Sequence, residues 1–349
     1  MKITRLVQKE IEKQQNNIPV IAIIGARQVG KSTLAKQLIS KEKNVVFLDM
    51  ELSSDRAIIK ETEAFLNMNK GKVICIDEIQ MMPDLFKELR PFIDNNSDTR
   101  FIILGSSSPE LMRQSSESLA GRIYYFELSP FLWAEIEDKS TMQKYRLLGG
   151  MPLSILAKTD ENAFVWVRNY IRTFLERDLR NFGFDIAPDN IRRLWVMLAH
   201  INGQILEPYH INVKKRLVKS PKILFRDTGV LHTLLKIESF EELFSHPAYG
   251  ASWEVTVIEN TIAKYSNWNY NFYRSSNGNE LDLVLSKGNR VIAIEIKTST
   301  SPKITRGFWV ALEDIGATES YVIAPVKMPY PLKNKTMVYP LEEFLAKDI

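Results

Sequence analysis

The sequence predicts an α/β protein with a parallel sheet at its N-terminal end, a helical middle and a second α/β domain at its C-terminal end. Three observations predict this fold class. Apolar runs alternate with helix-like stretches up to about residue 130, which is typical of parallel strands connected by helices. Beyond that point apolar and charged residues alternate at helical spacing, and near the C-terminus a helical stretch precedes two strand-like runs. We therefore expect three regions, at residues 1–132, 133–245 and 246–349.

The composition is that of an ordinary folded protein. A chain of 349 residues is long enough for two or three domains that each bury a core. Its 45% hydrophobic and 25% charged residues argue against disorder. The net charge of +4 and the sequence pI of about 8.9 permit a nucleic-acid partner but do not indicate one by themselves.

The sequence carries no recognisable membrane or export signal. No run approaches the roughly 20 apolar residues that span a bilayer, and residues 1–5 lack an apolar signal core. The single cysteine, Cys75, lies inside an apolar run, so we expect a core residue in a reducing compartment. These features predict a cytoplasmic protein without a membrane partner.

Five short runs in the first region have the composition of buried parallel strands. The first run is continuous and β-branched, as expected when helices cover both faces of a strand. A helix-like stretch at residues 31–40 follows it after a short glycine-containing loop. The five runs are residues 19–24, 45–49, 72–77, 101–106 and 123–127.

The loop after the first strand matches the phosphate-binding pattern G-x-x-x-x-G-K-[ST] in full. Its glycines allow a tight turn whose N–H groups face phosphates, and the helix that follows adds partial positive charge. We expect Lys31 to reach the β- and γ-phosphates and the Ser32 hydroxyl to bind Mg²⁺. The predicted nucleotide-binding residues are Gly25, Ala26, Arg27, Gln28, Val29, Gly30, Lys31, Ser32 and Thr33.

An acidic pair, Asp77 and Glu78, ends the third strand. Alone, such a pair is more often a solvated strand end than a catalytic pair. Downstream of a phosphate loop, however, Asp77 is placed to hold Mg²⁺ through water, and Glu78 to polarise the attacking water. We therefore predict that Glu78 is catalytic and that Asp77 belongs to the metal site.

These two motifs resemble those of a prokaryotic branch of the AAA-type ATPases. The loop of that branch reads Gly-Ala-Arg-Gln-Val-Gly-Lys and its acidic strand reads Ile-Asp-Glu-Ile-Gln, as at residues 25–31 and 76–80 here. The resemblance implies a P-loop NTPase sheet with strand order 5-1-4-3-2 and hydrolysis of ATP with Mg²⁺. It also implies that Ser106 is a sensor touching the γ-phosphate or the water. For Arg122 it implies an arginine finger, in cis or on a neighbouring subunit of a homo-oligomer, with a structural salt bridge as the alternative.

The middle region continues this resemblance at residues 147–152 and 170–178. Members of the branch carry a helix-turn-helix segment after a stretch like residues 198–204, and that segment is missing here near residues 207–208. A recognition helix for DNA is therefore not expected. Basic residues could instead contact nucleic acid or form a solvated face; they are Lys158, Arg168, Arg172, Lys214, Lys215, Arg216, Lys219, Lys222 and Arg226.

Two successive C-terminal strands carry the residues of a second candidate site. Side chains alternate along a strand, so Glu295 and Lys297 share a face, and the neighbouring strand can place Asp282 beside them. Carboxylates bind Mg²⁺, and the lysine would stabilise an anionic transition state or activate water. The preceding helix offers Glu254 or Glu259 as a further ligand.

Residues 250–326 resemble the DUF4143 module, which looks like the PD-(D/E)xK, or restriction-endonuclease-like, nuclease fold. The resemblance favours Glu254, since it follows Gly250 as in that module. Two functions remain open, beside a chance E-x-K pair. In the first, ATP hydrolysis drives or licenses cleavage or remodelling of DNA. In the second, the protein is a nucleotide-gated switch whose degraded module binds a partner and cuts nothing. The first predicts that Asp282, Glu295 and Lys297 converge around an open metal position, and the second that they do not.

Overall fold

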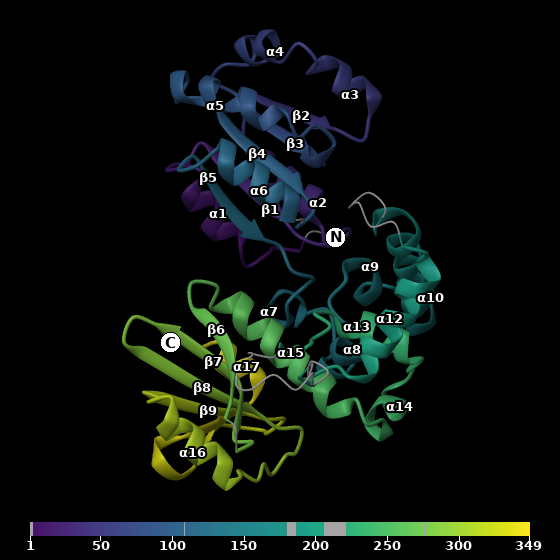
Figure 1. The fold of residues 1–349 in the computed structure, drawn as a ribbon, viewed down its shortest axis with the longest axis vertical. Coiled ribbons are helices and arrows are strands. Elements are labelled where there is room, and N and C mark those ends of the chain that lie inside the picture. The colour runs from purple at the N-terminus through teal and green to yellow at the C-terminus, as the bar shows by residue number, and fades with distance from the viewer. Residues whose placement is uncertain (1–2, 108, 180–185, 206–220, 276) are drawn as a thin grey trace, which may run out of the picture. The chain divides into compact units, whose positions relative to one another are not determined.

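The computed structural model describes residues 3–107, 109–179, 186–205, 221–275 and 277–349 (Figure 1). The chain forms two compact units, Met1–Phe131 and Leu132–Ile349. The further division of the second unit at residue 245 stays a prediction.

The first unit contains a five-stranded parallel sheet in the order β2-β3-β4-β1-β5. This is the order implied by the resemblance to AAA-type ATPases, read from the other edge, so the predicted fold class is confirmed. All five predicted strands form within one residue of their expected limits. They are β1 Val20–Ile24, β2 Val45–Asp49, β3 Val73–Asp77, β4 Arg100–Gly105 and β5 Ile123–Glu127.

Helices cover this sheet, and every residue of β1 and β3 is buried (Figure 1). Cys75 is fully buried, and burial raises the pKa of its thiol, as expected for a core residue. The carboxyl ends of β1, β3 and β4 lie side by side, so the residues that follow them share one edge. The helices are α1 Gln8–Gln14, α2 Lys31–Ile39, α3 Ser53–Ile58, α4 Thr62–Met68, η1 Ile79–Met81, α5 Leu85–Asn95 and α6 Pro109–Ser118.

The second unit begins with helices. Trp166 and Trp195 are partly buried against the apolar cluster that α10, α12 and α13 form. The elements are α7 Trp133–Ile136, α8 Met142–Leu148, α9 Pro152–Ile155, α10 Asp160–Thr173, the π-helical turn η2 Phe174–Asp178, α12 Pro188–His200, α13 Thr228–Leu235, α14 Phe240–Ser245 and α15 Tyr249–Lys264.

Asp227 connects residues 149–150 to the start of α13. Its carboxylate accepts hydrogen bonds from the Gly150 N–H (2.8 Å) and from the Val230 N–H (3.0 Å) at the start of α13. Gly149 has φ 70°, and a Cβ there would lie 2.4 Å from Asp227 Oδ1. Burial raises the pKa of Asp227, while the backbone N–H groups oppose that shift. The motif Gly149-Gly150 and Asp227 therefore form one structural junction.

Replacing Asp227 with alanine is expected to lower the free energy of unfolding by about 2–4 kcal/mol, because a helix cap and a second buried backbone partner are lost. Asp227→Asn should cost less, since its amide oxygen still accepts one bond. All six tryptophans lie in the second unit, so denaturation followed by tryptophan fluorescence measures this effect. An unchanged midpoint for Asp227→Ala would contradict the structural role.

The second unit ends in a six-stranded mixed sheet in the order β10-β11-β9-β8-β7-β6. The strands β7 and β8 form an antiparallel hairpin, and β8 pairs in parallel with β9. Residues of α15 and α17 pack with β7 and β8 in one apolar cluster, and residues of α16 pack with them in another. The elements are β6 Asn269–Arg274, β7 Glu280–Lys287, β8 Arg290–Ile296, α16 Arg306–Asp314, β9 Glu319–Ile323, β10 Tyr330–Pro331, η3 Lys333–Lys335, β11 Met337–Tyr339 and α17 Leu341–Leu345.

Across the described residues, none of the helices combines the length and the apolar character needed to cross a membrane.

Candidate functional site

The phosphate loop connects β1 to α2 through residues that adopt uncommon backbone conformations. Gly30 caps α2 with φ 99°, and Gln28 has φ 62°. A Cβ on Gly25 would lie 2.4 Å from the Leu128 carbonyl oxygen, so only glycine fits there. The loop is therefore shaped by close backbone packing at its start and by a left-handed turn at its end.

Lys31 lies at the first turn of α2 with its side chain folded over the loop. Its Nζ donates to the carbonyl oxygens of Gly25 (3.1 Å) and Ala26 (3.0 Å). Burial lowers the pKa of this ammonium, and the nearby charges of Glu78 and Asp77 oppose the shift. No carboxylate of the described residues forms an ion pair with it. Its charge is therefore only partly compensated, which suits a site for polyphosphate.

Asp77 and Glu78 stand at the end of β3, on the edge that the loop occupies. Asp77 is buried, and its Oδ1 accepts from the Glu78 N–H (3.0 Å). Glu78 has φ 52°, a left-handed conformation that is uncommon for glutamate and concentrates at functional positions. Burial raises the pKa of Glu78, opposed mainly by Lys31, and its carboxylate accepts from Gln80 Nε2.

Two polar atoms at this edge have no hydrogen-bond partner within the part of the chain that the structure describes. They are the buried Ser106 Oγ, just after β4, and Gln80 Oε1. A Cβ on Gly105 would lie 3.0 Å from Gln80 Oε1, so the Gln80 side chain reaches the end of β4. Buried polar groups normally find partners, and unpaired ones call for a ligand or water. Gln80 was recognised in the sequence only as part of a motif.

The remaining predicted nucleotide residues surround this edge. Ser32 is half-buried in the first turn of α2, whereas Thr33 is exposed. Arg27 forms an ion pair with Glu51 (2.9 Å). Ser32 and Asp77 offer the oxygen donors that Mg²⁺ prefers. The partly compensated ammonium of Lys31 and the unpaired hydroxyl of Ser106 lie at the same edge. The residues therefore fit a magnesium-bound triphosphate.

Arg122 lies at the amino ends of the strands, opposite the carboxyl ends where the phosphate loop lies. Its Nε and Nη2 donate to the two carboxylate oxygens of Asp94 (2.5 and 2.9 Å), and its carbonyl oxygen accepts from Val20 at the start of β1. A strand of five residues separates that end of the sheet from the phosphate loop by roughly 16 Å. Within this chain Arg122 forms the salt bridge that was the alternative to a finger. A finger on a neighbouring subunit stays a prediction.

Arg5 is a contributor to the site that the sequence analysis missed. It is 4% exposed, and its guanidinium donates to the carbonyl oxygens of Val29 (3.0 Å) and Ser129 (2.7 Å). A lone arginine near an N-terminus gives no signal of such a role, because its partner Ser129 lies 124 residues away in the sequence.

Residues of α15, β7 and β8 form the second candidate site. Asp282 Oδ2 accepts from the Ile296 N–H (2.8 Å), and Glu295 Oε1 lies 2.5 Å from Lys297 Nζ. Burial and the charge of Asp282 raise the pKa of Glu254 and of Glu295 to about 7. Burial lowers the pKa of Lys297, but the carboxylates outweigh it and the net shift is upward.

Lys222, predicted only as one of the basic residues, lies beside two carboxylates of this cluster. Lys222 Nζ forms an ion pair with Glu254, and it lies 3.8 Å from Asp282 Oδ1. It also lines a cavity of about 530 Å³ together with Gln204 and Glu280. No three His, Cys, Asp or Glu side chains in the described ranges are arranged to hold a metal ion. The ammonium group of Lys222 lies beside Glu254 and Asp282, two of the carboxylates predicted to bind the metal, so this arrangement does not fit a divalent cation.

Of the other basic residues predicted as phosphate contacts, Lys158 is exposed, and the rest are ion-paired or lie outside the described residues. Arg226 pairs with Glu259 (3.0 Å), which keeps Glu259 out of the cluster. The expected gap at residues 207–208 falls outside the described residues, as do Lys214, Lys215, Arg216 and Lys219.

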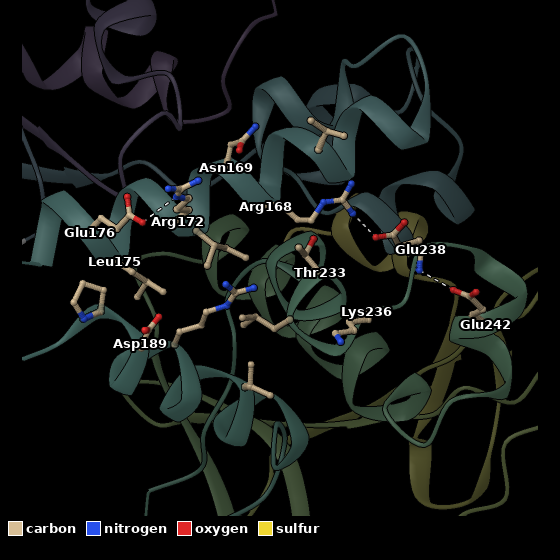
Figure 2. A pocket seen from close by; sticks show the side chains of 16 residues that line it. Arg168, Asn169, Arg172, Leu175, Glu176, Asp189, Thr233, Lys236, Glu238 and Glu242 are labelled. Atoms are coloured by element: carbon tan, nitrogen blue, oxygen red, sulfur yellow. Dashed lines mark hydrogen bonds and ion pairs between the residues drawn. The ribbon is translucent and has the colours of Figure 1, made fainter.

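A cavity of about 760 Å³ lies among α10, α12 and α13. Figure 2 shows that two of its arginines are held by acids, Arg168 by Glu238 and Arg172 by Glu176. Its charged lining residues include as many acids as bases, namely Arg168, Arg172, Arg192, Lys236, Glu176, Asp189, Glu238 and Glu242. The paired arginines agree with a solvated, ion-paired face, the alternative to a nucleic-acid surface.

Three family models match the chain. They are an AAA domain at residues 17–137, the domain of unknown function DUF8612 at residues 139–208 and 204–241, and the domain of unknown function DUF4143 at residues 249–344. Among solved structures, the chain is similar to the Walker-type ATPase PABY2304 of Pyrococcus abyssi, with TM-score 0.40 and 16% identity over 67% of this chain and 96% of that one. It is also similar to the STAND protein PH0952 of Pyrococcus horikoshii, with TM-score 0.32 and 13% identity over 76% and 46% of the two chains.

The chain also resembles curated relatives along almost its whole length. Uncharacterized proteins of Mycobacterium tuberculosis and Mycobacterium bovis are each 34% identical over 369 residues, which cover 96% of this chain and 83% of theirs. The order of the matched domains agrees with the resemblance found in the motifs. The chain therefore belongs to the family of proteins that carry an AAA ATPase domain at the N-terminal end and a DUF4143 domain at the C-terminal end.

Proposed function

We propose that the first unit hydrolyses ATP with Mg²⁺. The observation that carries this proposal is the meeting of four groups at one sheet edge, namely the ammonium of Lys31, the acids Asp77 and Glu78, and the unpaired hydroxyl of Ser106. A domain that binds a nucleotide without hydrolysing it needs the ammonium of Lys31, but it does not need an acid beside the terminal phosphate.

Each residue has a part in this chemistry. The loop N–H groups and Lys31 bind the phosphates, and Ser32 with Asp77 would hold Mg²⁺, which when bound neutralises charge on the phosphate oxygens. Glu78 polarises the water that attacks the γ-phosphorus and receives its proton, and Ser106 orients that water or the γ-phosphate.

Phosphate release from ATP by the full-length protein tests the proposal. We expect turnover with Mg²⁺ and none with a chelator. A folded protein that binds ATP but releases no phosphate under any divalent cation would overturn it.

For the second unit we infer a nucleotide-gated module that binds a partner, in preference to a nuclease that acts on DNA. The convergence of Glu254, Asp282, Glu295 and Lys297 is what a metal-dependent phosphodiesterase would require. The ammonium of Lys222 between Glu254 and Asp282 favours the module without cleavage, because it already supplies the positive charge that the carboxylates need.

A nuclease assay with Mg²⁺ or Mn²⁺ on single- and double-stranded DNA separates these functions. We expect equal background cutting by the wild type and by Asp282→Ala. Metal-dependent cutting that Asp282→Ala removes would establish the nuclease instead. Cutting that persists equally in both proteins would come from another source.

A further inference from the structure

We propose that Arg5 is a positioning residue that couples the phosphate loop to the segment through which the chain leaves the first unit. Nucleotide binding at the loop would then be transmitted along residues 128–131 into the second unit, which starts at Leu132. This proposal rests on nucleotide binding by the first unit.

The Arg5 guanidinium holds both segments at once. Its Nη1 donates to the Val29 carbonyl oxygen (3.0 Å) in the phosphate loop. Its Nη2 donates to the carbonyl oxygens of Ser129 (2.7 Å) and Pro130 (3.3 Å), and the guanidinium carbon lies 4.8 Å from the centre of the Phe131 ring. These acceptors are main-chain atoms, so the contact fixes the path of the backbone in both segments.

The beginning of the loop touches the same exit segment independently of Arg5. The Leu128 N–H donates to the Ile24 carbonyl oxygen (2.7 Å), and the Leu128 carbonyl oxygen packs against Gly25 so closely that a Cβ there would lie 2.4 Å away. Residues 128–131 therefore contact the phosphate loop at its first residue and again at Val29. A change in the loop between these points would therefore act on residues that contact the exit segment.

Nucleotide binding is expected to make such a change. Lys31 now donates to the carbonyl oxygens of Gly25 and Ala26, and a bound triphosphate would draw the ammonium away from them. The freed carbonyls lie between the two points that touch the exit segment. Arg5 is buried and multiply bonded, which makes it a stiff link across which a small shift in the loop is passed on.

The distribution of tryptophan provides an assay. The first unit has no tryptophan, whereas all six lie beyond Phe131, and Trp133 is two residues past it. A change of tryptophan emission caused by a nucleotide at the loop therefore reports an effect that has left the first unit. Emission would be titrated with a non-hydrolysable ATP analogue and Mg²⁺, and nucleotide affinity measured separately by equilibrium dialysis with labelled analogue.

We expect the wild type to bind the analogue and change its emission. Arg5→Met should still bind, with Kd raised about tenfold, which lies within the typical coupling between sites of about 5–150-fold. Its emission change should be lost, because the side chain that joins the loop to residues 128–131 is removed. Arg5→Lys keeps the charge but not the fork that reaches three carbonyls, so an intermediate response is expected. The matched control is Arg90→Met, an exposed arginine on α5, which should behave as the wild type.

Measuring nucleotide affinity and tryptophan emission separately distinguishes a loss of coupling from a loss of stability. Arg5→Met that binds the analogue and keeps the full emission change would overturn the proposal. So would a wild type that binds without any change of emission. Should Arg5→Met fail to fold, a wild-type response in Arg5→Lys would overturn it as well. A folded wild type without nucleotide affinity would instead refute the proposed function and, with it, this coupling.

Discussion

Replacing Glu78 with glutamine is expected to reduce the rate of ATP hydrolysis by about 10²–10⁴-fold while ATP still binds. The amide keeps the size of the side chain and can still meet Gln80, but it cannot take a proton from water. Glu78 directly follows β3 in a left-handed backbone conformation, at the edge where Lys31 and Ser106 lie. Phosphate release together with a separate measurement of ATP affinity checks this expectation.

Glu63→Gln is the matched control for that experiment. Glu63 is exposed on α4 and removing its charge should leave turnover unchanged. Normal turnover in Glu78→Gln would assign the base to another residue, and loss of ATP binding would mean that Glu78 shapes the site instead of activating water.

Loss of ATP binding is the expected result of Lys31→Met, with Kd raised at least about 100-fold, equivalent to roughly 2.7 kcal/mol. The ammonium is buried and contacts only carbonyl oxygens among its described hydrogen-bond partners, so a polyphosphate gains a strong charged contact when it binds. Methionine fills the same space without charge. The protein without nucleotide should be no less stable than the wild type, because a partly compensated buried charge is removed.

Equilibrium dialysis and thermal unfolding of Lys31→Met test both halves of this expectation. Lys36→Met, an exposed lysine one turn further along α2, is the control and should bind ATP normally. Unchanged affinity in Lys31→Met would show that the nucleotide does not sit in this loop.

Local chemistry explains why so much of the first unit could be predicted. The strand that ends at Ile24, the loop that follows and the helix that starts at Lys31 are contiguous, so residues that are close in the sequence are also close in space. Buried parallel strands are apolar throughout, so β1 and β3 could be predicted from the sequence. The strand order, in contrast, depended on the resemblance to AAA-type ATPases, since alternation of strands and helices fits several orders.

The second candidate site shows the limit of such reasoning. The hairpin that carries Asp282 and Glu295 is local, and it was predicted. Lys222 reaches Glu254 across 32 residues, and the pattern of the sequence could not distinguish it from its basic neighbours. A single ammonium group thereby changes what the carboxylate cluster can bind.

The sequence by itself determined the phosphate loop, the acidic pair beside it and the carboxylate hairpin, because each consists of residues that are neighbours along the chain. Only the tertiary structure decided that Arg5 holds the loop, that Arg122 is engaged by Asp94 and that Lys222 lies among the carboxylates. The physical reason is that a charged side chain is paired by whatever partner folding brings within reach, and those partners lie 24 to 124 residues away.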